Sequence, residues 1–263
     1  MKIRALAFVC LAVAGESAAQ ERAAGADTLY VTGHLDSGVS DGGGAEVEWL
    51  RAVTPGTSLL LGGASAAMDD LRWIYVTAGG FTRTKRAILS ARGSAGSSTY
   101  LDDGFAYVRL SGTATIPVAP RLYAEGEVQY VRIVGQGTTV VRLGGVYAGP
   151  RALAVRLTYN HTGTAQRAHA GSLSGRADLT LRRVSLFGGV TMSGIESFQP
   201  PAIDLVAHAT QESFFGSSVD VGRSQVIAAL QVVPRTDGRF SRMTATLRLP
   251  LGARTTATPG VAR

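Results

Sequence analysis

The residues best suited to acid–base chemistry are the histidines His34, His161, His169 and His208. His34 stands two residues before Asp36, so an extended strand would place both side chains on one face, as an acid–base pair requires. None of the four begins a His-x-Ser triplet that could activate a serine, and their spacing does not match a metal site. We therefore interpret His34 and Asp36 as a solvated pair and expect no catalytic residue, metal or cofactor.

Arginine is the more informative ionisable residue, because it alternates with apolar residues. The stretch SLSGRADLTLRR (172–183) places leucine, glycine and alanine at every second position, with serine, arginine, aspartate and threonine between them. A period of two gives a strand one apolar and one polar face. The charged residues that we expect on polar faces are Arg92, Arg109, Arg142, Arg156, Arg176, Arg182, Arg248, Glu125, Glu127 and Asp178.

The elements that must position these side chains are strands. Segments 106–116, 122–130 and 153–160 alternate in the same way, and weaker examples recur along the chain. No stretch keeps the i, i+3, i+4, i+7 spacing of a helix with caps. The better segments have about nine to thirteen residues, close to the roughly 9–11 that a tilted strand needs to cross the hydrocarbon of a membrane.

The connections show a second pattern. Short turns such as TPGT, TRTK, PVAP and AGPR separate every second pair of strands, whereas the links between them are predicted to be longer, at 37–44, 94–104, 161–168 and 193–213. Alternating turns and loops are typical of an up-and-down barrel. The sequence therefore predicts an all-β, antiparallel, transmembrane β-barrel over residues 20–263, with about 14 strands, or 12 as the alternative.

The N-terminus and the composition agree with export. Lys2 and Arg4 precede an apolar run that ends in small residues, which is the layout of a signal peptide over residues 1–19. The single cysteine, Cys10, lies within that segment, so we expect no disulfide. The formal charge is +7, but the arginines are spread at strand period without runs and interleaved aromatics, so we do not expect nucleic acid as a partner.

A barrel explains the alternation: apolar faces meet lipid and charged faces line an aqueous lumen. Aromatic residues near the segment ends are expected to form interfacial girdles on the apolar face; they are Trp49, Trp73, Tyr130, Tyr147 and Tyr159. The chain resembles bacterial outer-membrane β-barrel proteins. The phrases SLFGGVTMSG, SFFGSSVDVG and MTATLRLPLG, in the last third, resemble the YaiO-type outer-membrane family.

The function expected from this resemblance is non-enzymatic and lies in the outer membrane of a Gram-negative envelope. It would be porin-like, passive passage of solutes or saccharides, or a structural role beside a polysaccharide system. The resemblance implies outer-membrane lipid and the barrel-assembly machinery as partners. Alternatives are an outer-membrane barrel enzyme of the acyl-hydrolase type and a soluble periplasmic all-β binding protein.

The inner-face arginines allow two interpretations. Fixed guanidinium groups in a narrow pore would favour anionic or saccharide solutes. In the other interpretation, which we favour, arginines and carboxylates pair into salt bridges that hold neighbouring strands together in a plugged barrel, because inner faces of such barrels are commonly polar.

Overall fold

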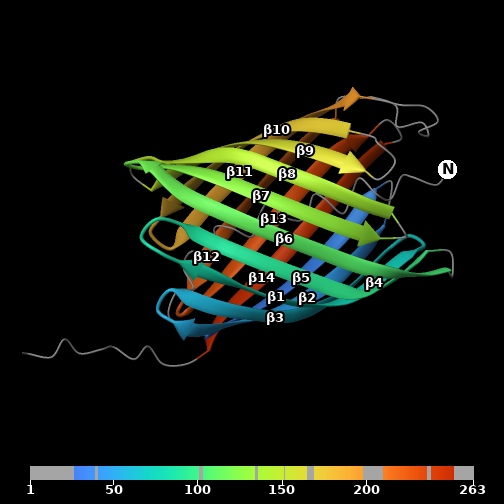
Figure 1. The fold of residues 1–263 in the computed structure, drawn as a ribbon, viewed down its shortest axis with the longest axis horizontal. Helices are drawn as coiled ribbons and strands as arrows, with labels where there is room; N and C mark the ends of the chain where they lie inside the picture. The colour runs from blue at the N-terminus through green and yellow to red at the C-terminus, as the bar shows by residue number, and fades with distance from the viewer. Residues whose placement is uncertain are drawn as a thin grey trace, which may run out of the picture.

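A computed structural model describes residues 27–38, 41–100, 103–133, 136–150, 152–164, 169–197, 210–235 and 238–251. They form fourteen antiparallel strands in one closed barrel, in which β14 pairs with β1 (Figure 1). The strands are β1 (Asp27–Gly38), β2 (Gly42–Thr54), β3 (Thr57–Met68), β4 (Leu71–Arg83), β5 (Ile88–Tyr100), β6 (Asp103–Ala119), β7 (Leu122–Ile133), β8 (Gln136–Ala148), β9 (Leu153–Thr164), β10 (His169–Leu181), β11 (Val184–Ser197), β12 (Thr210–Val221), β13 (Ser224–Arg235) and β14 (Gly238–Leu251).

The predicted fold class and the count of fourteen strands are confirmed, and the alternative of twelve is wrong. Among the described residues, no helix is long and apolar enough to span a membrane. The predicted signal peptide (1–19), His208 and the centre of the longest predicted loop (198–209) lie outside the described residues.

The predicted loops 37–44, 94–104 and 161–168 are too long, because the strands continue into them. For example, β5 extends to Tyr100 and β6 begins at Asp103. The end of β5 reads SAGSSTY, where both faces carry small residues, so the hydrophobic alternation disappears while the backbone ladder continues.

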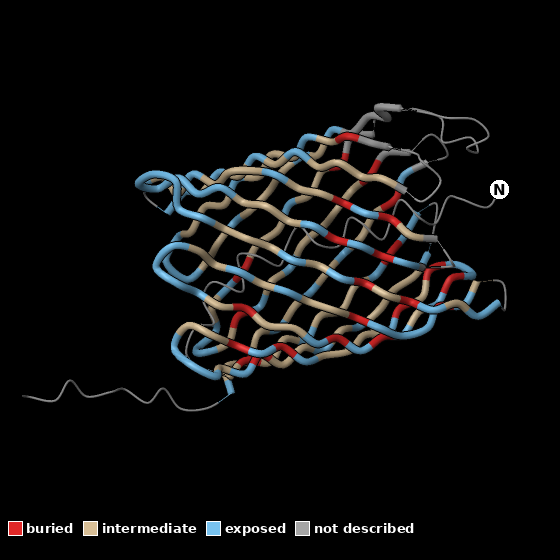
Figure 2. The backbone as a smooth tube through the Cα atoms, viewed as in Figure 1, coloured by how far each residue is buried: buried red, intermediate tan, exposed pale blue. Residues whose placement is uncertain are grey.

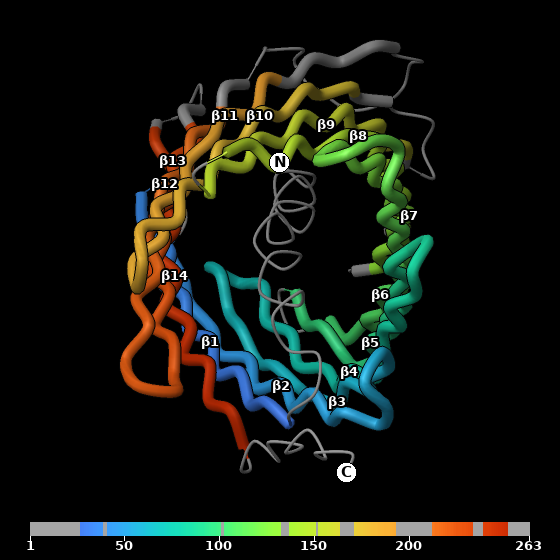
Figure 3. Tube along the Cα trace, turned by 90° about the vertical axis from the view of Figure 1, so that its left-hand side faces the viewer, coloured from blue at the N-terminus to red at the C-terminus, as the bar shows by residue number. Residues whose placement is uncertain are grey.

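The two ends of the barrel differ. One end carries the links at 55–56, 84–87, 120–121, 149–152, 182–183 and 222–223, together with the start of β1 and the end of β14; we call it the turn end. The links at the loop end include the longest one, between β11 and β12. Figure 3 looks into the barrel from the turn end.

The sequence period of two becomes an inner and an outer wall. Large apolar side chains such as Val76, Leu143 and Leu157 are exposed on the outside, whereas the residues between them are mostly more buried (Figure 2). This outer wall is apolar around the barrel, which is the arrangement that hydrocarbon surroundings require of a closed sheet.

Part of the inner wall is also apolar. Near the loop end, Leu71, Tyr75, Tyr107 and Val131 form one buried cluster, and Met68, Val233 and Phe240 form a second. Nearer the turn end, a third cluster consists of Leu50, Leu60 and Phe81, against which Tyr30 and Ile88 pack. The strands β2–β7, with β13 and β14, therefore present aromatic and aliphatic groups between their charged residues.

Candidate functional site: the polar inner wall

Two ion pairs join β7 to β8 and β9 along the inner wall. Arg142 on β8 donates to Glu127, its register partner on β7, at 2.7 Å. Arg156 on β9 lies 2.9 Å from the carboxylate of Glu125 on β7, so this pair passes over β8. The inner-wall residue of β8 between them is Gly144, which has no side chain to block the contact.

Arg92 makes the longest connection around the wall. It extends from β5 to β2, where it binds both Glu46 and Glu48. The intervening strands β3 and β4 present Gly62 and Gly79 on this path. A Cβ on Gly62 would lie 3.1 Å from the Glu48 side chain, and one on Gly79 would lie 3.0 Å from the Arg92 Cα. The glycines thus leave room for the pair.

An aromatic pair continues this group toward the loop end. Tyr75 donates to Glu46 at 3.3 Å, and its ring stacks on Tyr107 with centroids 4.9 Å apart. Arg109 follows Tyr107 on the inner face of β6 and is 7% exposed. Gln129 on β7 is fully buried, and within the described part of the chain neither of its side-chain polar atoms has a hydrogen-bond partner.

A second arginine group lies on β10–β12. Arg176 forms a bidentate contact with Asp178, and its guanidinium lies 4.8 Å from the ring centroid of Phe187 and 5.9 Å from that of Phe214. Each phenylalanine covers a glycine of the neighbouring strand: a Cβ on Gly189 would lie 2.6 Å from Phe214. The cation therefore rests on two rings whose positions depend on glycines.

The strands that close the barrel, β14 and β1, are also joined by an arginine–carboxylate ion pair. Arg242 on β14 donates to both carboxylate oxygens of Asp36 on β1, at 2.6 and 2.8 Å. His34 Nε2 lies 4.0 Å from Asp36 and has no hydrogen-bond partner among the described residues. At 4.0 Å the imidazole is too far from the carboxylate for the direct hydrogen bond of an acid–base pair.

Hydroxyl and amide groups line the wall between the charges. Asn160 donates to Ser172 and Ser174, and Ser174 also bonds Thr191, so one row crosses β9, β10 and β11. Similar cross-strand pairs are Thr32–Thr246, Thr77–Ser94, Ser90–Thr113 and Thr180–Ser185. These rows present groups that both donate and accept hydrogen bonds.

The charges of the inner wall nearly balance. On the inner faces of the strands, counted where the side chains are described, the arginines are Arg92, Arg109, Arg142, Arg156, Arg176, Arg242 and Arg248, and the carboxylates are Asp36, Glu46, Glu48, Asp103, Glu125, Glu127, Asp178, Glu212 and Asp220. Two of these acids accept hydrogen bonds from glutamines: Glu212 accepts from Gln231 and Asp220 from Gln225. The wall therefore carries no strong excess of either sign.

The structure places most of the predicted residues as expected and corrects two. Arg182 is in the β10–β11 turn, exposed and at φ 53°, instead of on the inner wall, because β10 ends at Leu181. Trp73 packs against two inner clusters, so it is not part of an outer girdle. Trp49, Tyr130, Tyr147 and Tyr159 lie on the outer face, and their interfacial role remains a prediction.

Sequence reasoning missed the inner aromatic residues, because β4 is apolar on both faces. Leu71, Trp73 and Tyr75 alternate there with Ile74 and Val76. It also missed the partners of Arg92 and Asp36, which depend on the register of distant strands. The glycines opposite Phe187 and Phe214 were a usable signal, since aromatic side chains often cover glycines across a pair of strands.

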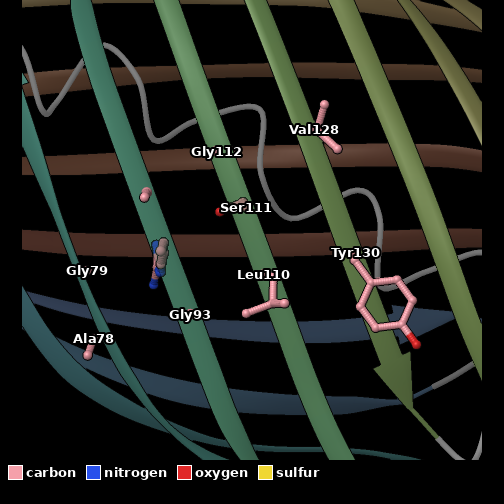
Figure 4. Close-up of a pocket in the computed structure, with 10 residues that line it drawn as sticks. Ala78, Gly79, Gly93, Leu110, Ser111, Gly112, Val128 and Tyr130 are labelled. Carbon is pink, nitrogen blue, oxygen red and sulfur yellow. The ribbon is translucent and has the colours of Figure 1, made fainter.

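An outward hollow of about 510 Å³ lies on the apolar side of β4–β7. Its lining includes the small residues Ala78, Ala91, Gly93 and Gly112. The larger side chains of Leu110, Val128 and Tyr130 also line it (Figure 4). In the part of the chain that is described, no group of three or more histidine, cysteine, aspartate or glutamate residues could hold a metal ion. The polar inner wall is thus the main candidate site.

The fold has solved counterparts. Similar structures are a bacterial polysaccharide outer membrane secretin (TM-score 0.56, 10% identity, covering 87% of this chain and 99% of that one), the CymD monoaromatic hydrocarbon channel (0.61, 8%, 85% and 87%) and the outer membrane protein Omp33 of Acinetobacter baumannii (0.52, 12%, 85% and 99%). No family profile matches the chain, and no curated protein matches its sequence. At these identities the likeness shows the fold.

Proposed function

We propose that this chain is a porin-like outer-membrane barrel that passes small, uncharged polar solutes, with saccharides as the favoured class. The observation that carries the proposal is the inner wall, where hydroxyl rows alternate with ion pairs that balance one another. Mutually paired charges give weak ion selectivity. Hydroxyl and amide groups beside aromatic rings suit sugars, which have polar edges and apolar faces.

The membrane placement follows from the outer wall. Exposed leucine, valine and tyrosine residues surround a sheet without free edges, which is the form in which strands can span a bilayer. Export by a cleaved signal peptide (1–19), insertion by the barrel-assembly machinery and membership of the YaiO-type family are parts of the same proposal. Of the two similar proteins, one is named for polysaccharide and the other for hydrocarbon. A hydroxyl-rich wall suits a polysaccharide better than a hydrocarbon.

The first test is the gel mobility of protein from the outer-membrane fraction, heated against unheated. A closed barrel keeps its compact form in detergent until boiled, so a heat-dependent shift is expected. Protein that is soluble in a periplasmic extract and shows no shift would favour the periplasmic binding protein instead.

The second test is the swelling of proteoliposomes in sugars of increasing size. Thr158→Trp adds bulk to the inner wall, whereas Leu157→Trp, the matched control on the same strand, adds it to the outer wall. Thr158→Trp should slow sugar entry and Leu157→Trp should not. Equal rates for both variants, or no swelling above empty liposomes, would contradict passage and leave the structural role.

A further inference from the structure

The turn end carries a ring of exposed cationic side chains. They are Arg51, Arg83, Lys85, Arg86, Arg121, Arg182, Arg183 and Arg223. Outside the lumen, the described carboxylate at this end is Asp27, which accepts a hydrogen bond from the Ala52 amide at 3.0 Å. The balance of charge seen on the inner wall is therefore absent at this rim.

Two of these arginines have a backbone conformation that is unfavourable for residues with a side chain. Arg121 has φ 67° and Arg182 has φ 53°, in the left-handed region that glycine or asparagine adopts more easily. The equivalent turn between β12 and β13 uses Gly222 for this conformation and places Arg223 after it. Ala152, in the β8–β9 turn, has the same conformation at φ 58°, so several turns at this end share it.

The distribution of the cations indicates what they face. Six of the eight lie in the turns β4–β5, β6–β7, β10–β11 and β12–β13, and therefore on several sides of the barrel. Arg51 is on the outer wall near the end of β2, with its guanidinium 5.8 Å from the ring centroid of Trp49. A ring with an outward-facing member matches a partner that surrounds the barrel, whereas a protein partner would match a patch on one side.

We propose that this ring binds the anionic headgroups of the phospholipid leaflet at the turn end, of the phosphatidylglycerol class. Each arginine or lysine near an anionic leaflet adds affinity, and an aromatic residue beside it suits the headgroup level. The inference rests on the proposed membrane placement but not on solute passage. The nearly balanced inner wall argues that the ring is not the mouth of an anion pore.

Three of these cations, Arg51, Lys85 and Arg86, offer a sharp test. The β4–β5 turn is held by its backbone and by Thr84, whose Oγ1 accepts from the amides of Arg86 and Ala87 at 3.2 and 3.0 Å. The side chains of Lys85 and Arg86 take no part in these bonds, so their replacement leaves the turn intact. Trp49 lies beside Arg51 on the outer wall and reports on the lipid there.

The chain has two tryptophans, so Trp73→Phe leaves Trp49 as the single fluorophore. The full chain with this change is placed in phosphatidylcholine vesicles that contain brominated phosphatidylglycerol or brominated phosphatidylcholine, and quenching of Trp49 gives the relative affinity. We expect a preference of about threefold or more for phosphatidylglycerol. It should weaken at high salt, because salt screens exposed charges.

Arg51→Gln with Lys85→Gln and Arg86→Gln should reduce the preference to near unity. The matched control removes three exposed arginines at the loop end, Arg72, Arg132 and Arg239, and should retain it. Equal quenching by both lipids in the unaltered ring, or an unchanged preference in the turn-end variant, would overturn the proposal. The heat-dependent gel shift verifies the barrel in every variant, and sugar swelling is scored separately, so failure of passage is distinguishable from failure of lipid binding.

Discussion

The guanidinium of Arg92 on β5 binds the carboxylate of Glu46 on β2 at 2.8 Å, across two intervening strands. Backbone hydrogen bonds join only neighbouring strands, whereas this side-chain contact links the two outer strands of the four-strand sector β2–β5. It is possible because Gly62 and Gly79 carry no side chains on the path. Glycine in these strands therefore has a specific role: it allows a charged residue to brace a wide sector of the wall.

Arg92→Gln should lower the free energy of unfolding by about 2–3 kcal/mol, less than for a fully buried pair because the partners are partly exposed. The loss leaves Glu46 and Glu48 close together without their cation. Urea unfolding in detergent micelles measures it. Adding Glu46→Gln and Glu48→Gln should recover most of the loss, and equal stability of Arg92→Gln and the unaltered chain would show that the brace contributes nothing.

Gly79→Ala should destabilise the barrel by about 1–3 kcal/mol, as expected of overpacking. Its Cβ would lie 2.5 Å from the backbone oxygen of Ala91, which cannot move without disturbing β5. Gly175→Ala is the control, since nothing lies within 4 Å of its Cβ. The same urea titration compares the two variants, and a loss at Gly175 as large as at Gly79 would contradict the steric argument.

Ion selectivity should respond to either member of a wall pair in opposite directions. Arg142→Gln leaves Glu127 without its partner at 2.7 Å and should shift the reversal potential in a KCl gradient toward cation selectivity. Glu127→Gln should shift it toward anions, and the double variant should return near the original value. A double variant that keeps the shift of either single change would argue against charge balance as the basis of weak selectivity.

The sequence was sufficient for the fold because the period of two survives in most strands. Leu153, Val155 and Leu157 alternate with Arg156 and Thr158, and the structure places these sets on opposite walls. The ends of the strands were not predictable in this way. Near the end of β5 both faces carry small residues, so the backbone hydrogen bonds continue although the sequence shows no hydrophobic alternation.

The sequence predicted which residues lie on the inner wall, but it did not predict which side chains they contact. The parity of a strand places Arg92 or Asp36 on the inner wall, but the identity of the group it meets depends on registers between strands far apart in sequence. The prediction for Trp73 was wrong for a different reason. Its strand is apolar on both faces, so the sequence does not show which face is the inner one. The inner cluster contains Leu71 and Tyr75, which share the face of Trp73.

Asparagine at the two left-handed turn positions should stabilise the barrel while removing charge. Arg121→Asn and Arg182→Asn relieve a positive φ that asparagine adopts more readily, and each should raise the free energy of unfolding by about 0.5–1 kcal/mol. Arg223→Asn should give no gain, because Gly222 holds the left-handed conformation in that turn.

Uncharged detergent micelles isolate this backbone effect from lipid binding. In vesicles containing phosphatidylglycerol the gain should shrink, because each lost cation also removes a headgroup contact that favours the folded, inserted chain. The urea midpoints of all three variants in both environments check this. A gain of equal size in micelles and in anionic vesicles would mean that Arg121 and Arg182 make no headgroup contact that favours the folded, inserted chain.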